Sequence, residues 1–352
     1  MNNIIARLLF AAVALLNASS AWLAPCIAAN PSCTEWINYS GGSSRSLIYR
    51  TYSLREKNEN ITRAFILVHG AGRDADNYFR TAVGAAFFGG ALEDTIVIAP
   101  RMASNDGHNC KDILASNEVS FNCGSWRSGG PAISDNKVNS FVFIDELLRQ
   151  LARKGAFPNL REIVLAGHSA GGQFVTRYEM SNKVNDELGV PISYVVANPS
   201  SYAYPDALRP NSETAKADTL DFAAFQDARN CTTYNNWPYG LEDRSKAGYN
   251  AKVSDDQLRR QLASRPVTYL LGEIDILPLG GFDSSCPAMA QGPTRLARGQ
   301  AFAKFVNGKY GAKHKVAVVP LCGHNARCMF TSEVALPIIF PPEAAPTAPA
   351  NR

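Results

Sequence analysis

Short apolar runs alternate with longer segments of helical periodicity along most of the chain. The runs consist of β-branched and aliphatic residues without polar alternation, as in strands that are buried on both faces of a sheet. They predict strands over residues 64–70, 95–100, 162–169, 193–199, 267–273 and 315–320. Two polar, extended-looking segments near the start, TEWINYS and RSLIYRTYS, are expected to add antiparallel strands.

The segments between the strands predict helices. In SFVFIDELLRQLARKG, Ser140 is a candidate N-terminal cap, and one helical face collects the apolar residues Phe141, Ile144, Leu148 and Leu151. A second helix is expected over TRLARGQAFAKFVNG. Because strands and helices alternate and no hairpin turn joins successive strands, the predicted fold class is α/β, with a mostly parallel central sheet and helices on both faces.

One stretch breaks this alternation. Residues 200–265 are rich in Tyr, Pro, Asn and Asp, carry little periodicity, and lie between two predicted strands. This position predicts an insertion over the carboxyl edge of the sheet, which forms either a cap above the site or a surface excursion that touches no substrate. We therefore expect one domain over residues 30–340 that contains the insertion at about 200–265.

The first residues have the pattern of a secretory signal peptide. Arg7 precedes an apolar run, and small residues that suit signal peptidase follow it. The run is too short to span a bilayer, so a membrane-anchoring helix is the weaker alternative. We expect residues 1–21 to be removed, with cleavage as late as residue 29 as the alternative. The Pro- and Ala-rich residues 341–352 predict a disordered tail.

The cysteines favour an oxidising location, either outside the cell or in the periplasm. Cleavage after Ala21 keeps Cys26 and leaves all eight cysteines available for four disulfides, whereas the later cleavage leaves one without a partner. Spacing along the chain suggests three pairs and, by elimination, a fourth: Cys110 with Cys123, Cys322 with Cys328, Cys26 with Cys33, and Cys231 with Cys286.

Composition and charge narrow the function classes. A chain of 352 residues with 46% hydrophobic content can bury the core of one enzyme-sized domain. The net charge of +4 is small and its Lys and Arg residues are scattered, which argues against nucleic acid as a partner. After removal of the signal peptide no segment predicts a membrane span. Because no phosphate-binding loop, dinucleotide fingerprint or zinc-spaced histidine cluster is present, the sequence predicts no cofactor and no metal.

The strongest chemical signal is the segment IVLAGHSAGGQ, in which a predicted buried strand meets a predicted helix. At the junction, Gly167-His168-Ser169-Ala170-Gly171 matches the G-x-S-x-G pattern, in which a serine on a tight, strained turn presents its hydroxyl above the sheet. Side chains at the glycine positions would collide with the neighbouring strand and helix. The sequence therefore predicts Ser169 as a nucleophile.

A serine hydroxyl needs a base within hydrogen-bonding reach, and that base is nearly always histidine. His324 follows the last predicted strand, where a loop can reach back over the carboxyl edge of the sheet to Ser169. His168 lies inside the turn, with its side chain expected to point away from the serine. His324 is therefore the predicted general base.

A carboxylate should orient that histidine. Asp275 follows the predicted strand 267–273 and gives the chain order serine, acid, histidine, while Glu273 and Asp283 are the alternatives. Acyl transfer also needs donors for an oxyanion. The backbone N–H of Ala170 is one candidate, and the N–H of Ala71 in VHGAGRDADNYF, with Gly72 as the alternative, is the other.

Aromatic residues recur in the loops expected around the site. Exposed rings at Trp126, Tyr202 and Trp237 are candidates for stacking on a sugar or an aromatic acyl group. The alternative is that these rings pack the insertion onto the sheet.

The segments FILVHGAG, GHSAGG, GEID and CGH occur in the order and context of the α/β-hydrolase superfamily, which the chain resembles from about Ala64 to Phe340. In loop style the chain looks most similar to secreted polyester depolymerases and to feruloyl or acetylxylan esterases. The resemblance implies an α/β-hydrolase fold, a Ser169, Asp275 and His324 triad, and hydrolysis of a small-molecule or polymeric ester. A serine peptidase or amidase of the same fold and a non-catalytic secreted binding protein are the alternatives. The natural substrate and the oligomeric state stay open.

Overall fold

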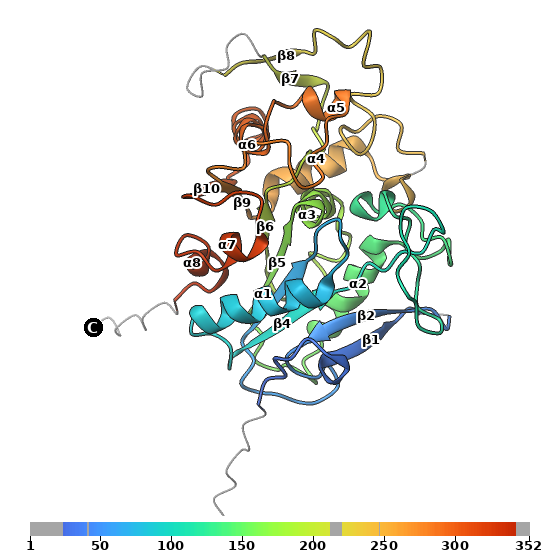
Figure 1. The fold of residues 1–352 in the computed structure, drawn as a ribbon, viewed down its shortest axis with the longest axis vertical. Helices are drawn as coiled ribbons and strands as arrows, with labels where there is room; N and C mark the ends of the chain where they lie inside the picture. Colours follow the sequence, from blue (N-terminus) through green and yellow to red (C-terminus); the bar gives the residue numbers. More distant parts are fainter. Residues whose placement is uncertain (1–23, 41, 212–219, 246, 343–352) are drawn as a thin grey trace, which may run out of the picture.

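The computed structural model describes residues 24–40, 42–211, 220–245 and 247–342, and its centre is an eight-stranded sheet in the order β1-β2-β4-β3-β5-β6-β9-β10 (Figure 1). The predicted signal peptide and the predicted tail from residue 343 onward lie outside the described residues. The sheet contains β1 (Thr34–Asn38), β2 (Arg45–Arg50), β3 (Arg63–Val68), β4 (Thr95–Pro100), β5 (Glu162–His168), β6 (Ile192–Ala197), β9 (Val267–Gly272) and β10 (Lys315–Val319).

The sheet is mostly parallel, as predicted. The neighbours β4, β3, β5, β6, β9 and β10 all pair in parallel. At one edge β1 pairs antiparallel with β2, and β2 pairs antiparallel with β4, which confirms the antiparallel strands expected at the start. Because the strands from β3 onward run in one direction, their carboxyl ends meet at one edge, and loops from distant parts of the sequence converge there.

Helices cover both faces of the sheet, and alternate residues of β3 show the division. Ile66 belongs to the larger core cluster, together with residues of α2, α3, α4 and α6, whereas Phe65 and Leu67 belong to the cluster with α1, α7 and α8. The helices are α1 (Ala75–Phe88), α2 (Ser140–Leu151), α3 (Ala170–Ser181), α4 (Asp255–Ser264), α5 (Cys286–Met289), α6 (Arg295–Tyr310), α7 (Ala326–Phe330) and α8 (Leu336–Ile339).

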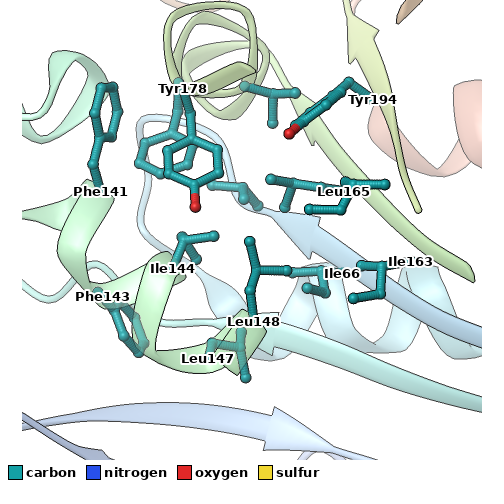
Figure 2. Packing of buried hydrophobic residues seen from close by; sticks show 14 of the residues in the cluster. Ile66, Phe141, Phe143, Ile144, Leu147, Leu148, Ile163, Leu165, Tyr178 and Tyr194 are labelled. Carbon is teal, nitrogen blue, oxygen red and sulfur yellow. The ribbon is translucent and has the colours of Figure 1, made fainter. Parts of the chain in front are cut away.

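The predicted apolar face of α2 is confirmed. Figure 2 shows Ile144 and Leu148 directed toward strand residues such as Ile66, whereas the ring of Phe141 packs against Tyr178 of α3; all three side chains are fully buried. The predicted cap is wrong. Asn139 caps α2 by accepting hydrogen bonds from the N–H groups of the first turn, because the helix already begins at Ser140, whose hydroxyl instead donates to a backbone carbonyl of the neighbouring loop.

The described part of the 200–265 insertion contains a short hairpin of β7 (Leu208–Pro210) and β8 (Phe222–Ala224), a 3₁₀ turn η4 (Gly248–Asn250) and α4. The hairpin lies at the end of the molecule opposite β1 and β2 (Figure 1). Helix α4 packs against α3 and α6, so this part of the insertion extends the helical layer.

All four predicted cysteine pairs are present as disulfides: Cys26–Cys33, Cys110–Cys123, Cys231–Cys286 and Cys322–Cys328. The Cys231–Cys286 bond ties the insertion to the start of α5, and Cys322–Cys328 closes the loop after β10. Within the described ranges, no helix has both the length and the apolar character that a membrane crossing requires.

Candidate active site

Ser169 occupies the turn between β5 and α3 with φ 58° and ψ −117°, a left-handed conformation that a side chain rarely adopts. Close packing around the turn requires glycine on either side. A Cβ at Gly171 would collide with the backbone carbonyl of Val68, and a Cβ at Gly167 would collide with that of Gly171. The tight turn therefore directs the hydroxyl of Ser169 above the carboxyl edge of the sheet.

The structure brings Ser169, His324 and Asp275 together from three separate loops. The Oγ of Ser169 lies 2.9 Å from Nε2 of His324, and Nδ1 of His324 lies 2.7 Å from Oδ2 of Asp275. A carboxylate accepts, so Nδ1–H donates to Asp275 and leaves Nε2 free to accept the hydroxyl proton of Ser169. This geometry is that of a nucleophile, a base and a group that orients the base.

Arg295, at the start of α6, holds the other oxygen of Asp275. Its Nη1 lies 3.3 Å from Oδ1 of Asp275, and both side chains are almost completely buried. The same guanidinium donates to Oγ of Ser200 and to the carbonyl of Gly280. Burial lowers the pKa of Arg295, and the nearby Asp275 opposes that shift. Asp275 is thus held on both sides, by His324 and by an arginine.

The loop that carries His324 is tied to the neighbouring strand ends. The side chain of Asn198, just after β6, donates to the carbonyl of Gly323 at 3.2 Å and accepts from the N–H of Gly272 at 2.8 Å. Glu273, an alternative acid in the sequence, accepts from the N–H of Leu321 at 2.8 Å and so also braces the loop. The His324 imidazole is 13% exposed, which leaves it accessible from the site.

His168 packs beside His324. Its ring centroid lies 4.7 Å from that of His324, and its Nδ1 is hydrogen-bonded at 2.9 Å to the hydroxyl of Tyr78. Burial lowers the pKa of His168 well below its ordinary value, and the neighbouring His324 and Arg295 lower it further. A neutral ring in this position fills the space behind His324 without adding a second positive charge.

The loop after β3 is held by its carbonyl groups. Burial lowers the pKa of His69 to about 4, and its neutral ring bonds to the carbonyl of Gly70 and accepts from the N–H of Met102, both at 2.9 Å. Arg73 donates to the carbonyl of Ala71 at 3.0 Å. Among the described residues, the N–H groups of Ala71 and Ala170 have no hydrogen-bond acceptor.

These groups surround an open cavity of about 570 Å³. Its lining includes Ser169, His168 and His324, the Gly70–Gly72 loop and the Asn325–Arg327 segment. The cavity therefore exposes the serine hydroxyl and the loop of the predicted Ala71 donor to the same bound molecule. Within the described ranges, no group of three or more His, Cys, Asp or Glu residues is placed to hold a metal ion.

The aromatic candidates do not line this cavity. Trp126 and Tyr202 are buried in the core, where Trp126 packs against Phe174 and Tyr202 stacks on Phe302, so the prediction that they bind substrate is wrong. Trp237 is partly buried and donates its indole N–H to the carbonyl of Ser128 at 3.1 Å. These contacts join the three rings to α3, α6 and the 3₁₀ turn η2 (Ser125–Ser128), so they serve packing, although not against the sheet alone.

Sequence reasoning missed Arg295, Asn198 and the packing role of His168. Arg295 lies 20 residues beyond its partner Asp275. Its position at the start of an amphipathic segment gave a weak signal, because arginine is seldom fully buried unless it is paired. Asn198 gave no signal in the sequence.

The chain matches the model of the family described as "Alpha/beta hydrolase family" over residues 65–335. Solved structures of similar fold include the poly(3-hydroxybutyrate) depolymerase LpqC from Bordetella parapertussis, with 20% identity, coverage of 87% of this chain and 90% of that chain, and a TM-score of 0.59. Poly(aspartic acid) hydrolase-1 from Sphingomonas sp. KT-1 has 21% identity, coverage of 87% and 98%, and a TM-score of 0.55. No curated protein matches the chain.

Proposed function

The chain belongs to the alpha/beta hydrolase family, and from this premise we propose that it is a serine hydrolase that cleaves carboxylic esters through an acyl-enzyme intermediate on Ser169. One observation carries the proposal: an unbroken line of hydrogen bonds runs from the hydroxyl of Ser169 through His324 to Asp275. A serine nucleophile requires a base that accepts its proton and a group that orients that base, whereas a structural serine requires neither.

In the proposed reaction, Oγ of Ser169 attacks the ester carbonyl carbon while Nε2 of His324 takes its proton. Asp275 stabilises the imidazolium that forms. The alcohol leaves with the proton from His324, and Ser169 keeps the acyl group. A water molecule then attacks this ester with His324 again as the base, which releases the carboxylic acid and restores Ser169.

In this proposal the backbone N–H groups of Ala170 and Ala71 donate hydrogen bonds to the carbonyl oxygen and stabilise the negative charge that develops on it. Both groups lack acceptors within the described residues, and Ala71 lines the cavity. Donors of this kind are each worth on the order of 3 kcal/mol in the transition state. Because His69 and Arg73 hold the carbonyl oxygens of this loop, the donors need little reorganisation when the charge appears.

We also propose that the protein is secreted or periplasmic, with residues 1–21 as the signal peptide and residues 30–340 as the catalytic domain. The four disulfides support an oxidising location. The Cys26–Cys33 bond supports cleavage after Ala21, since cleavage after residue 28 or 29 would remove Cys26 and leave Cys33 without a partner.

Ser169→Ala tests the enzymatic proposal directly. We expect p-nitrophenyl acetate, butyrate and octanoate to be hydrolysed by the mature protein, and kcat to fall by about 10⁴-fold or more in the variant. The exposed Ser264→Ala is the matched control and should retain full activity. Poly(3-hydroxybutyrate) belongs in the substrate panel because a structure of the same fold is named for its depolymerisation.

A fluorophosphonate probe separates the alternatives. Labelling of Ser169 without turnover of any ester would redirect the proposal to an amide substrate. A folded protein that shows neither labelling nor turnover would contradict the enzymatic proposal and favour a binding protein.

A further inference from the structure

A second cavity, of about 470 Å³, adjoins the one that contains Ser169. The two cavities share Gly281, next to Gly280, whose carbonyl is held by Arg295. Residues of η2 (Ser125–Ser128), of α3 and of the 200–265 insertion line the second cavity, and its lining includes Arg127 and Arg177. We call it the arginine cavity.

Arg177 brings a positive charge to the arginine cavity that no carboxylate contacts directly, although the charge of Asp283 in the same lining acts on it. It is 2% exposed, and its partners are neutral: the carbonyl of Pro238 at 3.0 Å, Oγ of Ser201 at 3.0 Å and, at 3.4 Å, the carbonyl of Arg127. A guanidinium has five N–H donors, so these contacts leave donors unused. Burial lowers the pKa of Arg177 to about 10, which still leaves the group protonated at neutral pH.

Arg127, on η2, adds a second positive charge to the lining. Its contacts are also neutral, with Nε donating to the carbonyl of Gly124 at 3.1 Å and Nη1 donating to Oε1 of Gln173 at 3.2 Å. Neither Arg127 nor Arg177 forms an ion pair within the described residues.

Asp283 is the acidic residue in the lining of the arginine cavity, and its carboxylate oxygens already accept hydrogen bonds, one of them from Tyr239 of the same lining. Oδ2 accepts from the hydroxyl of Tyr239 at 2.8 Å, and Oδ1 accepts from Oγ and N of Ser285 at 2.6 and 3.1 Å. Two arginines and one aspartate leave the lining with a net charge of +1. A cavity with the buried guanidinium of Arg177, the partly exposed guanidinium of Arg127 and this net charge suits a carboxylate monoanion better than a phosphate dianion.

Helix α3 links the two cavities. Ser169, Gln173 and Arg177 follow one another at a spacing of four, which places them on one side of the helix. With a rise of 1.5 Å per residue, the Cα atoms of Ser169 and Arg177 are about 12 Å apart along the axis. Helical side chains lean toward the N-terminal end, so the guanidinium of Arg177 leans back toward the serine.

We propose that the arginine cavity is a subsite that binds a free carboxylate group on the ester substrate, so that the preferred substrates are esters with an acidic end. This proposal rests on the proposed esterase function. The acidic end belongs either to the acyl part, as in the monoester of a dicarboxylic acid, or to the alcohol part, as in the ester of a hydroxy acid. Both sources present the same carboxylate to Arg127 and Arg177.

Paired substrates test the subsite. The first pair is the p-nitrophenyl monoester of suberic acid and the same compound with its free carboxyl methylated; the second is the butyrate ester of 6-hydroxyhexanoic acid and its methyl ester. We expect kcat/KM to be about 10- to 100-fold higher for the free acid of at least one pair, because charged hydrogen bonds contribute that range. The pair that shows the preference identifies the part that carries the carboxylate.

Arg177→Gln and Arg127→Gln should each remove most of that preference and change kcat/KM for the methyl esters by less than about threefold. The control Arg149→Gln removes an equal charge from an exposed site on α2, outside both cavities, and should keep the preference. Arg127 is partly exposed, so Arg127→Gln tests the subsite by itself if Arg177→Gln fails to fold.

Equal kcat/KM for acid and methyl ester in the wild type would overturn the subsite while leaving the esterase function intact. An equal loss on both substrates in the variants would also overturn it, since that outcome indicates a structural role. If no ester is hydrolysed, calorimetric titration of suberate into Ser169→Ala still tests the cavity. Binding that Arg127→Gln abolishes supports the subsite, and absence of suberate binding contradicts it.

Discussion

Buried arginines distinguish this protein at the scale of the residue. Arg177, Arg295 and Arg298 are each 2% exposed or less, although arginine is seldom buried without a partner. Arg295 is paired with Asp275, whereas Arg298 donates to the backbone carbonyls of Ser200, Gly292 and Asp283. Unpaired buried charge is costly, so each side chain needs compensating contacts. Arg295 and Arg298 donate to loop groups near the site, and Arg177 is the side chain for which we propose an anionic ligand.

Arg295→Lys tests whether Arg295 positions the proposed acid. An ammonium group cannot reach Asp275, Ser200 and Gly280 together, so Asp275 and His324 should lose part of their alignment. We expect kcat to fall about tenfold or more while KM changes by less than about twofold. Steady-state kinetics on an uncharged p-nitrophenyl ester measure both.

Arg298→Lys is the matched control for that change. It lies one turn further along α6, is equally buried, and makes no contact with Asp275. It should lower thermal stability with little effect on kcat. Equal losses of kcat in the two variants would show that Arg295 contributes to the fold and not specifically to the alignment of Asp275.

At the scale of the element, a buried carboxylate joins three segments of the helical layer. Asp145 on α2 accepts from the hydroxyls of Tyr178 on α3 and Tyr249 in η4, both at 2.7 Å. Burial raises the pKa of Asp145 to about 6, and the two tyrosine hydrogen bonds oppose that shift. One side chain thus links the proposed nucleophile helix, its neighbour and the insertion.

The stability of the fold should depend on pH through Asp145. The folded-state pKa lies above the unfolded value, so the stability that Asp145 contributes is complete below about pH 4 and is lost as the pH rises through about 6. The unfolding free energy of Asp145→Asn, measured relative to that of the wild type, should therefore rise by on the order of 3 kcal/mol between pH 4 and pH 8. Urea unfolding across that range measures the difference.

Asp186→Asn provides the control, since Asp186 is exposed and lies outside this cluster. Because its side chain makes no contact with Asp145, Tyr178 or Tyr249, this variant should not reproduce the change with pH that is expected for Asp145→Asn. A difference between Asp145→Asn and the wild type that stays constant with pH would show that Asp145 ionises normally in the folded protein.

At the scale of the whole molecule, the parallel sheet assembles the site. The turn after β5 carries Ser169, and the loops after β9 and β10 carry Asp275 and His324. The loop after β3 brings Ala71 beside them. Since parallel strands end at one edge, residues separated by up to 155 positions come within hydrogen-bonding distance.

The exported chain should begin at Trp22 and contain no free thiol. Signal cleavage after Ala21 retains Cys26, and all eight cysteines are then paired. Intact mass spectrometry with and without reduction measures both features. Cys26→Ser should leave one free thiol, at Cys33, which is buried and is therefore titrated after unfolding. A wild-type chain that begins after residue 28 or 29 would contradict the proposed cleavage site.

Local patterns predicted much of the fold. The apolar runs predicted the strands, and the glycines around Ser169 predicted the strained turn, because the steric demands of a buried strand and of a tight turn act on neighbouring residues. The chain order of serine, acid and histidine followed from strand ends that the sequence already marked. Short spacing likewise indicated three of the four disulfides.

The sequence by itself thus determined the α/β fold class and the residues that meet at the strand ends. The tertiary structure decided that Trp126 and Tyr202 belong to the core, that Arg295 pairs with Asp275, and that Arg177 and Arg127 line one cavity. Burial and charge compensation depend on which distant segments pack together, and a local sequence pattern does not predict that packing. The sequence therefore does not distinguish a buried arginine from an exposed one, because only the packing of the folded molecule determines the exposure of the side chain.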